Sequence, residues 1–173
     1  GLSGSAITLL STQTASSSAT ISFTSGIDST YKEYIFKFYD IHPATDSTDF
    51  SFQVNAAGGS GYNETITSSF FRSFHGDADG GATLAYYATL DQDQGTGFQA
   101  LCENVGNDND SQLSGILRLY DPSTTSFYKH FASRTVIHAE SDFAVENYIT
   151  GYINTTTAID EIQFKMDSGN IDS

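Results

Sequence analysis

The sequence predicts an all-β protein, an antiparallel sandwich of two sheets, and three observations support this prediction. Apolar and polar residues alternate along many short runs, as in strands with one buried and one wet face. Clusters of Asp, Asn, Gly, Ser and Pro separate these runs at short spacing, which is typical of turns between antiparallel strands. No window keeps a helical period over about 11 residues, so little helix is expected.

The stretch YKEYIFKFYDIHPATDSTDFSFQVN, residues 31–55, contains the clearest pair of predicted strands. Pro43 fixes its own φ and pushes His42 out of the helical region, so the segment between the two runs is predicted to be a structural turn rather than a site. The two strands are expected to form a hairpin-like unit that needs a second apolar layer, supplied by residues 113–120 and 127–138. The apolar positions of the two runs are Tyr34, Phe36 and Phe38, and Phe50, Phe52 and Val54.

The remaining strands are predicted from the same alternation. The run TITSSFFRSFH at residues 65–75 breaks it at Phe70, Phe71 and Phe74, which predicts a bulge or burial on both faces. Residues 113–120 and 127–138 flank a turn and are expected to pair as a hairpin. About ten strands predict a single domain over residues 1–173, a β-sandwich of the jelly-roll type, with a barrel as the alternative. Further strands are expected at residues 6–11, 19–24, 83–90, 98–103, 144–153 and 162–166.

Composition restricts the partners of this protein. The formal net charge is −14, from 7 Lys plus Arg against 21 Asp plus Glu. Such a surface repels phosphate groups and anionic lipid, so no nucleic-acid and no membrane partner is expected. No run approaches the roughly 20 apolar residues of a membrane span, and the start does not read as a signal peptide. The single cysteine, Cys102, lies in GFQALCEN and is expected to be a small buried hydrophobe.

No catalytic constellation is recognised, and the chain is expected not to be an enzyme. The histidines at positions 42, 75, 130 and 138 fit neither HExxH nor zinc spacing with cysteine, and no GxSxG elbow or phosphate-binding glycine motif is present. Paired carboxylates such as Asp77/Asp79 could serve in glycoside hydrolysis, but they lie in Gly-rich loops. Hydrolysis is therefore the weaker alternative, and no catalytic or cofactor-binding residue is assigned.

Three acidic loops carry the strongest chemical signal, with the sequences DADG, DQDQ and NDND at residues 77–80, 91–94 and 107–110. Calcium takes six to eight oxygen ligands in flexible geometry, which alternating Asp and Asn side chains can offer. No loop continues to the distal Glu of an EF-hand, and Asp, Asn and Gly are also common turn residues, so turn chemistry is the alternative. The candidate calcium ligands are Asp77, Asp79, Asp91, Asp93, Asp108 and Asp110.

Tyrosine rings offer a second kind of candidate site. Exposed rings can stack on sugars, whereas buried rings pack in the core, and core packing is the alternative for most of them. The candidate rings are Tyr31, Tyr39, Tyr62, Tyr86, Tyr87 and Tyr152.

Four long phrases stand out beyond these short motifs. They are STQTASSSATISFTSGIDSTYKEYIFKFYDIHPATDSTDFSFQ at residues 11–53, SGYNETITSSFFRSFH at 60–75, GNDNDSQLSGILRLYDPSTTSFYKHF at 106–131 and GYINTTTAIDEIQFKMDSGNID at 151–172. Together they cover most of the chain and resemble a family of structural proteins of marine tailed bacteriophages, including cyanophages. The resemblance implies a virion component, with fibre, appendage and head-decoration roles all open, and it supplies no catalytic residue.

Members of that family typically continue past SGNID into a short final strand of the kind GTIKxYG, whereas this chain stops at Ser173. The resemblance therefore implies a sheet edge that is open or filled by another subunit. The expected function is that of a non-enzymatic capsid-decoration or tail-fibre domain, located in the virion and extracellular after host lysis. Other virion proteins and further copies of the chain are the expected partners. The alternative is a carbohydrate-binding module for host adhesion, assisted by calcium.

Overall fold

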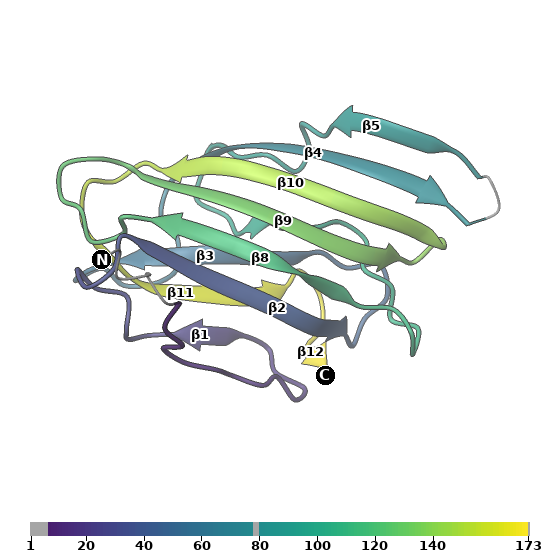
Figure 1. Cartoon of the computed structure of the whole chain (residues 1–173), viewed down its shortest axis with the longest axis horizontal. Helices are drawn as coiled ribbons and strands as arrows, with labels where there is room; N and C mark the ends of the chain where they lie inside the picture. Colours follow the sequence, from purple (N-terminus) through teal and green to yellow (C-terminus); the bar gives the residue numbers. More distant parts are fainter. Residues whose placement is uncertain (1–6, 78–79, 173) are drawn as a thin grey trace, which may run out of the picture.

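Two antiparallel β-sheets make up the computed structural model, which describes residues 7–77 and 80–172 (Figure 1). The small sheet has the order β1-β11-β3-β7, and the large sheet has the order β12-β2-β8-β9-β10-β4-β5, with β6 also paired to β4. The strands are β1 (Ile21–Phe23), β2 (Glu33–Pro43), β3 (Phe50–Ala56), β4 (Ile66–Gly76), β5 (Ala82–Tyr86), β6 (Asp93–Gly95), β7 (Gln99–Ala100), β8 (Leu113–Tyr120), β9 (Lys129–Ala139), β10 (Phe143–Ile153), β11 (Ile159–Met166) and β12 (Ile171–Asp172).

No helix occurs in the residues that the structure describes, as the alternating pattern predicts. Across residues 7–77 and 80–172 there is accordingly no helix long and apolar enough to cross a membrane.

Aromatic side chains join the two sheets. Phe38 on β2 contacts Phe50 on β3 and Phe164 on β11, with ring centroids 5.2 Å apart in both pairs. Phe52 on β3 meets Phe131 on β9 at 5.1 Å. All these residues belong to one cluster of buried side chains that draws on both sheets. The predicted antiparallel β-sandwich is therefore confirmed.

The predicted hairpin of β2 and β3 is wrong, because the two strands belong to different sheets. β2 pairs with β8 in the large sheet, whereas β3 pairs with β11 and β7 in the small one. The second apolar layer for β2 is thus β3 and β11, while β8 and β9 lie in its own sheet. Asp46 and Asp49 in the connection accept hydrogen bonds from the backbone N–H groups of Asn107 and Asn104 at 3.1 and 3.0 Å. The segment serves as a structural turn between the layers.

The jelly-roll order is not confirmed. An eight-stranded jelly roll divides its strands between two sheets, whereas eight of the strands here lie in one sheet. Within that sheet β8, β9 and β10 are consecutive neighbours, and the predicted hairpin of β8 and β9 is present, with Leu113 opposite Ile137 and Leu119 opposite Phe131.

The structure also tests three local predictions, which concern residues 7–11, β4 and Cys102. Residues 7–11 form no strand, because Ile7, Leu9 and Leu10 are exposed and no other segment pairs with them; Ala6 lies outside the described residues. β4 is apolar on both faces rather than bulged against β10, since its register with β10 runs without a shift while Phe70 is buried and Phe71 is 39% exposed. Cys102 is fully buried as predicted, and its Sγ accepts the Phe50 N–H at 3.3 Å.

The segment from residue 87 to residue 105 covers the part of the large sheet that the small sheet does not reach. Arg72 on β4 forms an ion pair with Glu103 at 2.6 Å and lies over the ring of Tyr87, 4.0 Å from its centroid. Ser68 on β4 donates to Gln99 Oε1 at 2.6 Å. The inner face of β4 is therefore covered at Ser68 and Arg72, whereas Thr83 on β5 stays exposed.

Candidate functional site

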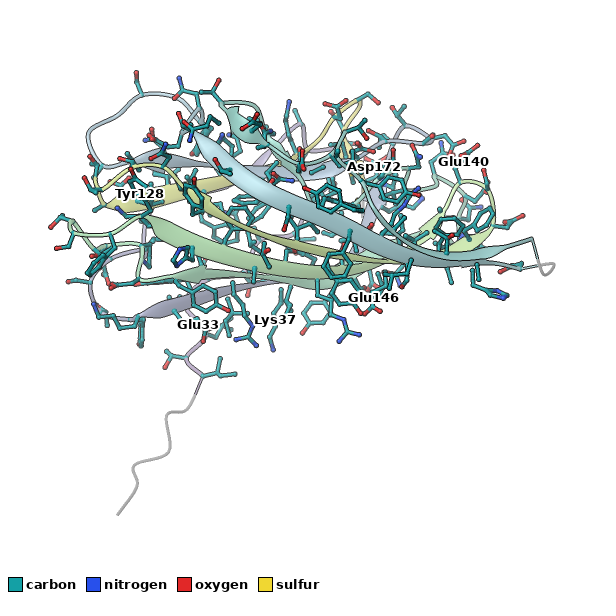
Figure 2. All side chains as sticks on the ribbon, turned by 90° about the horizontal axis from the view of Figure 1, so that it is seen from above. Glu33, Lys37, Tyr128, Glu140, Glu146 and Asp172 are labelled. Atoms are coloured by element: carbon teal, nitrogen blue, oxygen red, sulfur yellow. The ribbon has the colours of Figure 1, made fainter. Side chains whose placement is uncertain are left out.

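The outer face of the large sheet, formed by the side chains that point away from the small sheet, is the best candidate site. Side chains of β9 alternate between the core and the outer face: Phe131 and Thr135 are buried, whereas Arg134 and Val136 are exposed on the outer face. Figure 2 places Glu33, Lys37 and Glu146 along its lower side, on this outer face. Strand register therefore determines which side chains meet there.

An aromatic row crosses the outer face perpendicular to the strands; it consists of Arg134, Tyr148, Phe71 and Tyr86. These residues are cross-strand neighbours on β9, β10, β4 and β5. The rings of Phe71 and Tyr148 stack with centroids 4.9 Å apart, and the Arg134 guanidinium lies 5.5 Å from the Tyr148 centroid. Tyr86 at the end of the row is 58% exposed. Three aromatic side chains on adjacent strands thus lead from Arg134 to the sheet edge.

A parallel row lies one step further along the strands. Val136, Glu146, Ser73 and Leu84 are in register on β9, β10, β4 and β5. They line an open depression together with residues of neighbouring rows. Val136 and Leu84 are both exposed, so the apolar character of the outer face extends beyond the aromatic row.

A second depression lies where the β8–β9 hairpin turns. Phe127 and Tyr128 are exposed there, and the Tyr128 ring stacks on Tyr152 of β10 with centroids 5.6 Å apart. Asp121 and His130 add polar groups beside these rings. The lining residues are Tyr120, Asp121, Thr124, Phe127, Tyr128 and His130.

Charges on the outer face are locally balanced, although the whole chain carries −14. Arg118 pairs with Glu33 at 2.6 Å, and Arg134 pairs with Glu146. Hydrogen bonds from Tyr148 and then from Arg134 hold the pKa of Glu146 below its usual value. Lys37 adds a further cation to this face. The outer face thus lacks the acidic excess of the loops.

The candidate calcium ligands do not come together. Asp77 follows the end of β4, whereas Asp93 pairs with Thr67 at its start, about 30 Å away at roughly 3.3 Å per residue. Asp91 accepts the hydroxyl of Tyr86, and Asp108 and Asp110 lie in the turn before β8. Asp79 lies outside the described residues. Within residues 7–77 and 80–172 no group of three or more His, Cys, Asp or Glu could hold a metal ion, so calcium binding stays a prediction.

The candidate tyrosines divide into exposed and packed rings. Tyr39 and Tyr86 are exposed, whereas Tyr31 and Tyr87 pack against the core. Tyr62 donates to Glu161 at 2.8 Å. Sequence reasoning missed Phe71, Tyr148, Phe127 and Tyr128. The adjacent aromatic residues at positions 70 and 71 were the available signal, since one of two neighbours on a strand must face outward.

Comparisons with protein-family models, with curated proteins and with solved structures found no match. The resemblance to phage structural proteins therefore rests on the sequence phrases alone.

Proposed function

We propose that this chain is a non-enzymatic virion structural protein, a capsid-decoration or tail-fibre domain that binds other proteins through the outer face of its large sheet. The observation that supports the contact surface is a group of apolar side chains on one face, the exposed Phe71, Tyr86, Val136 and Leu84 and the half-buried Tyr148. Exposed apolar areas of this kind mark interaction sites in soluble proteins. The virion setting, and a location outside the host after lysis, come from the sequence resemblance alone.

The stacking geometry favours a protein partner over a sugar on the aromatic row. Phe71 and Tyr148 are parallel within 6°, so one face of each ring meets the other ring, and the Arg134 guanidinium lies 5.5 Å from the Tyr148 centroid. A sugar stacks on a free ring face, whereas a protein side chain can pack on the exposed ring edges.

Cross-linking of intact particles tests this function. Particles that contain the chain are purified through a density gradient and treated with an amine-reactive cross-linker, and cross-linked peptides are identified by mass spectrometry. We expect links from Lys37, which lies on the outer face, to a different virion protein. Lys165, whose ammonium lies 4.6 Å from the centroid of the Phe98 ring on the small sheet, is the internal control. A chain that does not sediment with particles, or one whose outer face links to nothing, contradicts the proposal.

Glycan binding is the second candidate, and the depression at the β8–β9 turn is the feature that favours it. Phe127 is 72% exposed there, in a depression that Asp121 and His130 also line, and a ring next to hydrogen-bonding groups is typical of sugar sites. Affinity electrophoresis in gels that contain polysaccharide, with and without calcium, tests this candidate. Retardation should be lost in Phe127→Ala and kept in Tyr39→Ala, a matched exposed ring on β2. Equal mobility in all gels contradicts it.

A further inference from the structure

The free edge of β5 is an unprotected strand edge. β5 ends the order of the large sheet, and β4 is its partner among the described strands. In Figure 1 it lies at the upper margin of the sheet with no strand beyond it. Its sequence, ATLAY, contains neither a charged residue nor a proline, the two devices that most often block edge pairing.

Hydrogen bonds on the β4 side determine which backbone groups of β5 are free. The Tyr87 N–H donates to the Phe70 carbonyl at 2.9 Å, and the Gly76 N–H donates to the Gly81 carbonyl at 3.0 Å. Antiparallel pairs alternate between bonded and non-bonded positions, so between these two contacts residues 83 and 85 bond to β4. The backbone N–H and C=O groups that point to the open side belong to Ala82, Leu84 and Tyr86.

The other sheet edges are protected or short. β2 carries Glu33 and Lys37, its register shifts between Phe38 and Ile41, and Asp40 has a positive φ of 52°. Charges and bulges of this kind oppose the addition of a strand. β12 covers the Pro43 end of β2. In the small sheet, β1 has three residues and β7 has two.

We propose that β5 pairs antiparallel with β5 of a second copy of this chain, about a two-fold axis through Leu84. Leu84 then exchanges both backbone hydrogen bonds with the partner's Leu84, and Ala82 does so with the partner's Tyr86. The outer faces of both copies lie on the same side of one continuous sheet, so the two aromatic rows form one longer surface. This inference rests on the proposed function, since it identifies one of the protein contacts through which the chain acts.

The absence of charge on β5 allows the same strand of a second copy to occupy this edge. A basic partner would be attracted to the acidic loops, whereas β5 has no charged side chain with which it could form an ion pair. Two chains of net charge −14 repel each other, and a contact through uncharged β5 adds no further pair of like charges within the interface. Screening by salt reduces that repulsion, and the dimer should therefore become tighter as ionic strength rises.

The exposed apolar side chains beside the edge add to the backbone bonds. Leu84 is 72% exposed, and in the pair it lies against the partner's Leu84 at a Cα distance of about 5.5 Å. A stable interface buries roughly 800 Å² on each partner, and a strand of five residues gives less than that. The dimer is thus concentration-dependent in dilute solution and is favoured where many copies are held close together.

Cysteine cross-linking of the whole chain tests both the contact and its register. Leu84→Cys should form a disulfide-linked dimer on mild oxidation, because its Cα distance across the axis lies within the range for disulfides. Ala82→Cys and Tyr86→Cys should each fail alone, since each residue lies about 14 Å from its own copy, but they should link when mixed. Buried Cys102 does not compete.

Sedimentation velocity over a concentration series supplies the second measurement. Leu84→Pro removes the free N–H and the apolar side chain without touching a bond to β4, and it should raise the dimer Kd at least tenfold. Tyr39→Ala, at an exposed residue of β2 on the opposite side of the large sheet, leaves the net charge unaltered and should leave the Kd unchanged. A native chain that stays monomeric at every concentration and salt level, or Ala82→Cys linking alone as well as Leu84→Cys, overturns the pairing. If Lys37 still links to another virion protein in that case, only the edge contact fails and the proposed function stands.

Discussion

Phe71 on β4 and Tyr148 on β10 are in register across the two strands, and their rings lie parallel within 6° at a centroid separation of 4.9 Å. Cross-strand aromatic pairs contribute about 0.5–1.5 kcal/mol beyond the area they bury. We therefore expect a double-mutant cycle of Phe71→Ala and Tyr148→Ala, measured by urea unfolding, to give a coupling of about 1 kcal/mol. The control cycle combines Phe71→Ala with Tyr39→Ala, whose effects on the free energy of unfolding should be additive. An equally large coupling energy in the control cycle contradicts a specific interaction between Phe71 and Tyr148.

Lys129 should make stability rise with pH. Its side chain is fully buried, and its Nζ donates to the Thr155 carbonyl at 3.0 Å. Burial lowers the pKa of Lys129 below its ordinary 10.5. The unfolded chain then holds this proton more tightly than the native one, so stability increases as pH rises through the lowered pKa toward 10.5.

The variant Lys129→Met should lose the rise of stability with pH that Lys129 causes. Near neutral pH, its free energy of unfolding should be no more than about 1 kcal/mol below that of the native protein. Denaturant unfolding of both proteins over a pH series measures the difference. Lys37→Met, at a lysine of the outer face, is the matched control. A native-minus-variant difference that stays flat up to pH 10.5 contradicts the expected role of burial.

Gly115 is required by the close approach of β8 to β9. A Cβ at this position would lie 2.5 Å from the Arg134 carbonyl oxygen and 2.8 Å from Thr135 Cα, both backbone atoms that cannot move independently. Gly115→Ala should therefore cost about 1–3 kcal/mol of unfolding free energy, as overpacking does. Ser114→Ala, on the neighbouring residue, should stay within about 0.5 kcal/mol. Equal urea midpoints for the two variants would show that the strands can separate without cost.

Calcium binding at the acidic loops predicts a higher thermal midpoint in calcium than in chelator. A cation that binds only the native state adds about 2.7 kcal/mol at a concentration of 100 times Kd. Asp77→Asn, Asp91→Asn with Asp93→Asn, and Asp108→Asn with Asp110→Asn test the three loops separately, because the structure places them apart. Magnesium at the same ionic strength is the control, and identical midpoints in all three solutions contradict calcium binding.

Strand positions were largely predictable from the sequence, because alternation and turn residues are local. Leu113–Tyr120 was predicted to the residue, and little helix was expected, with none found in the described part of the chain. The pairing of β2 was not predictable in this way. Its neighbours β8 and β12 lie far along the chain, and the turn at Pro43 fits a change of sheet as well as a hairpin.

The candidate surface was less predictable than the fold, for the same reason. Each strand reveals which of its residues share a face, but the aromatic row exists only because β9, β10, β4 and β5 lie side by side in one register. Tyr86 was identified as a candidate ring from its sequence alone. Phe71 was recognised as a disturbance of alternation, and its role became clear only from its neighbour Tyr148.

The pairing of Phe52 with Phe164 has a consequence for how the chain folds. β3 pairs with β11, and most strands of the large sheet lie between these two strands along the chain. During synthesis, the small sheet therefore cannot form until the C-terminal strands have left the ribosome. The β8–β9–β10 meander can form first from local contacts, with its inner face uncovered. Contacts so distant in sequence slow folding and expose apolar surface to aggregation, so we expect slow refolding and a dependence of yield on chaperones.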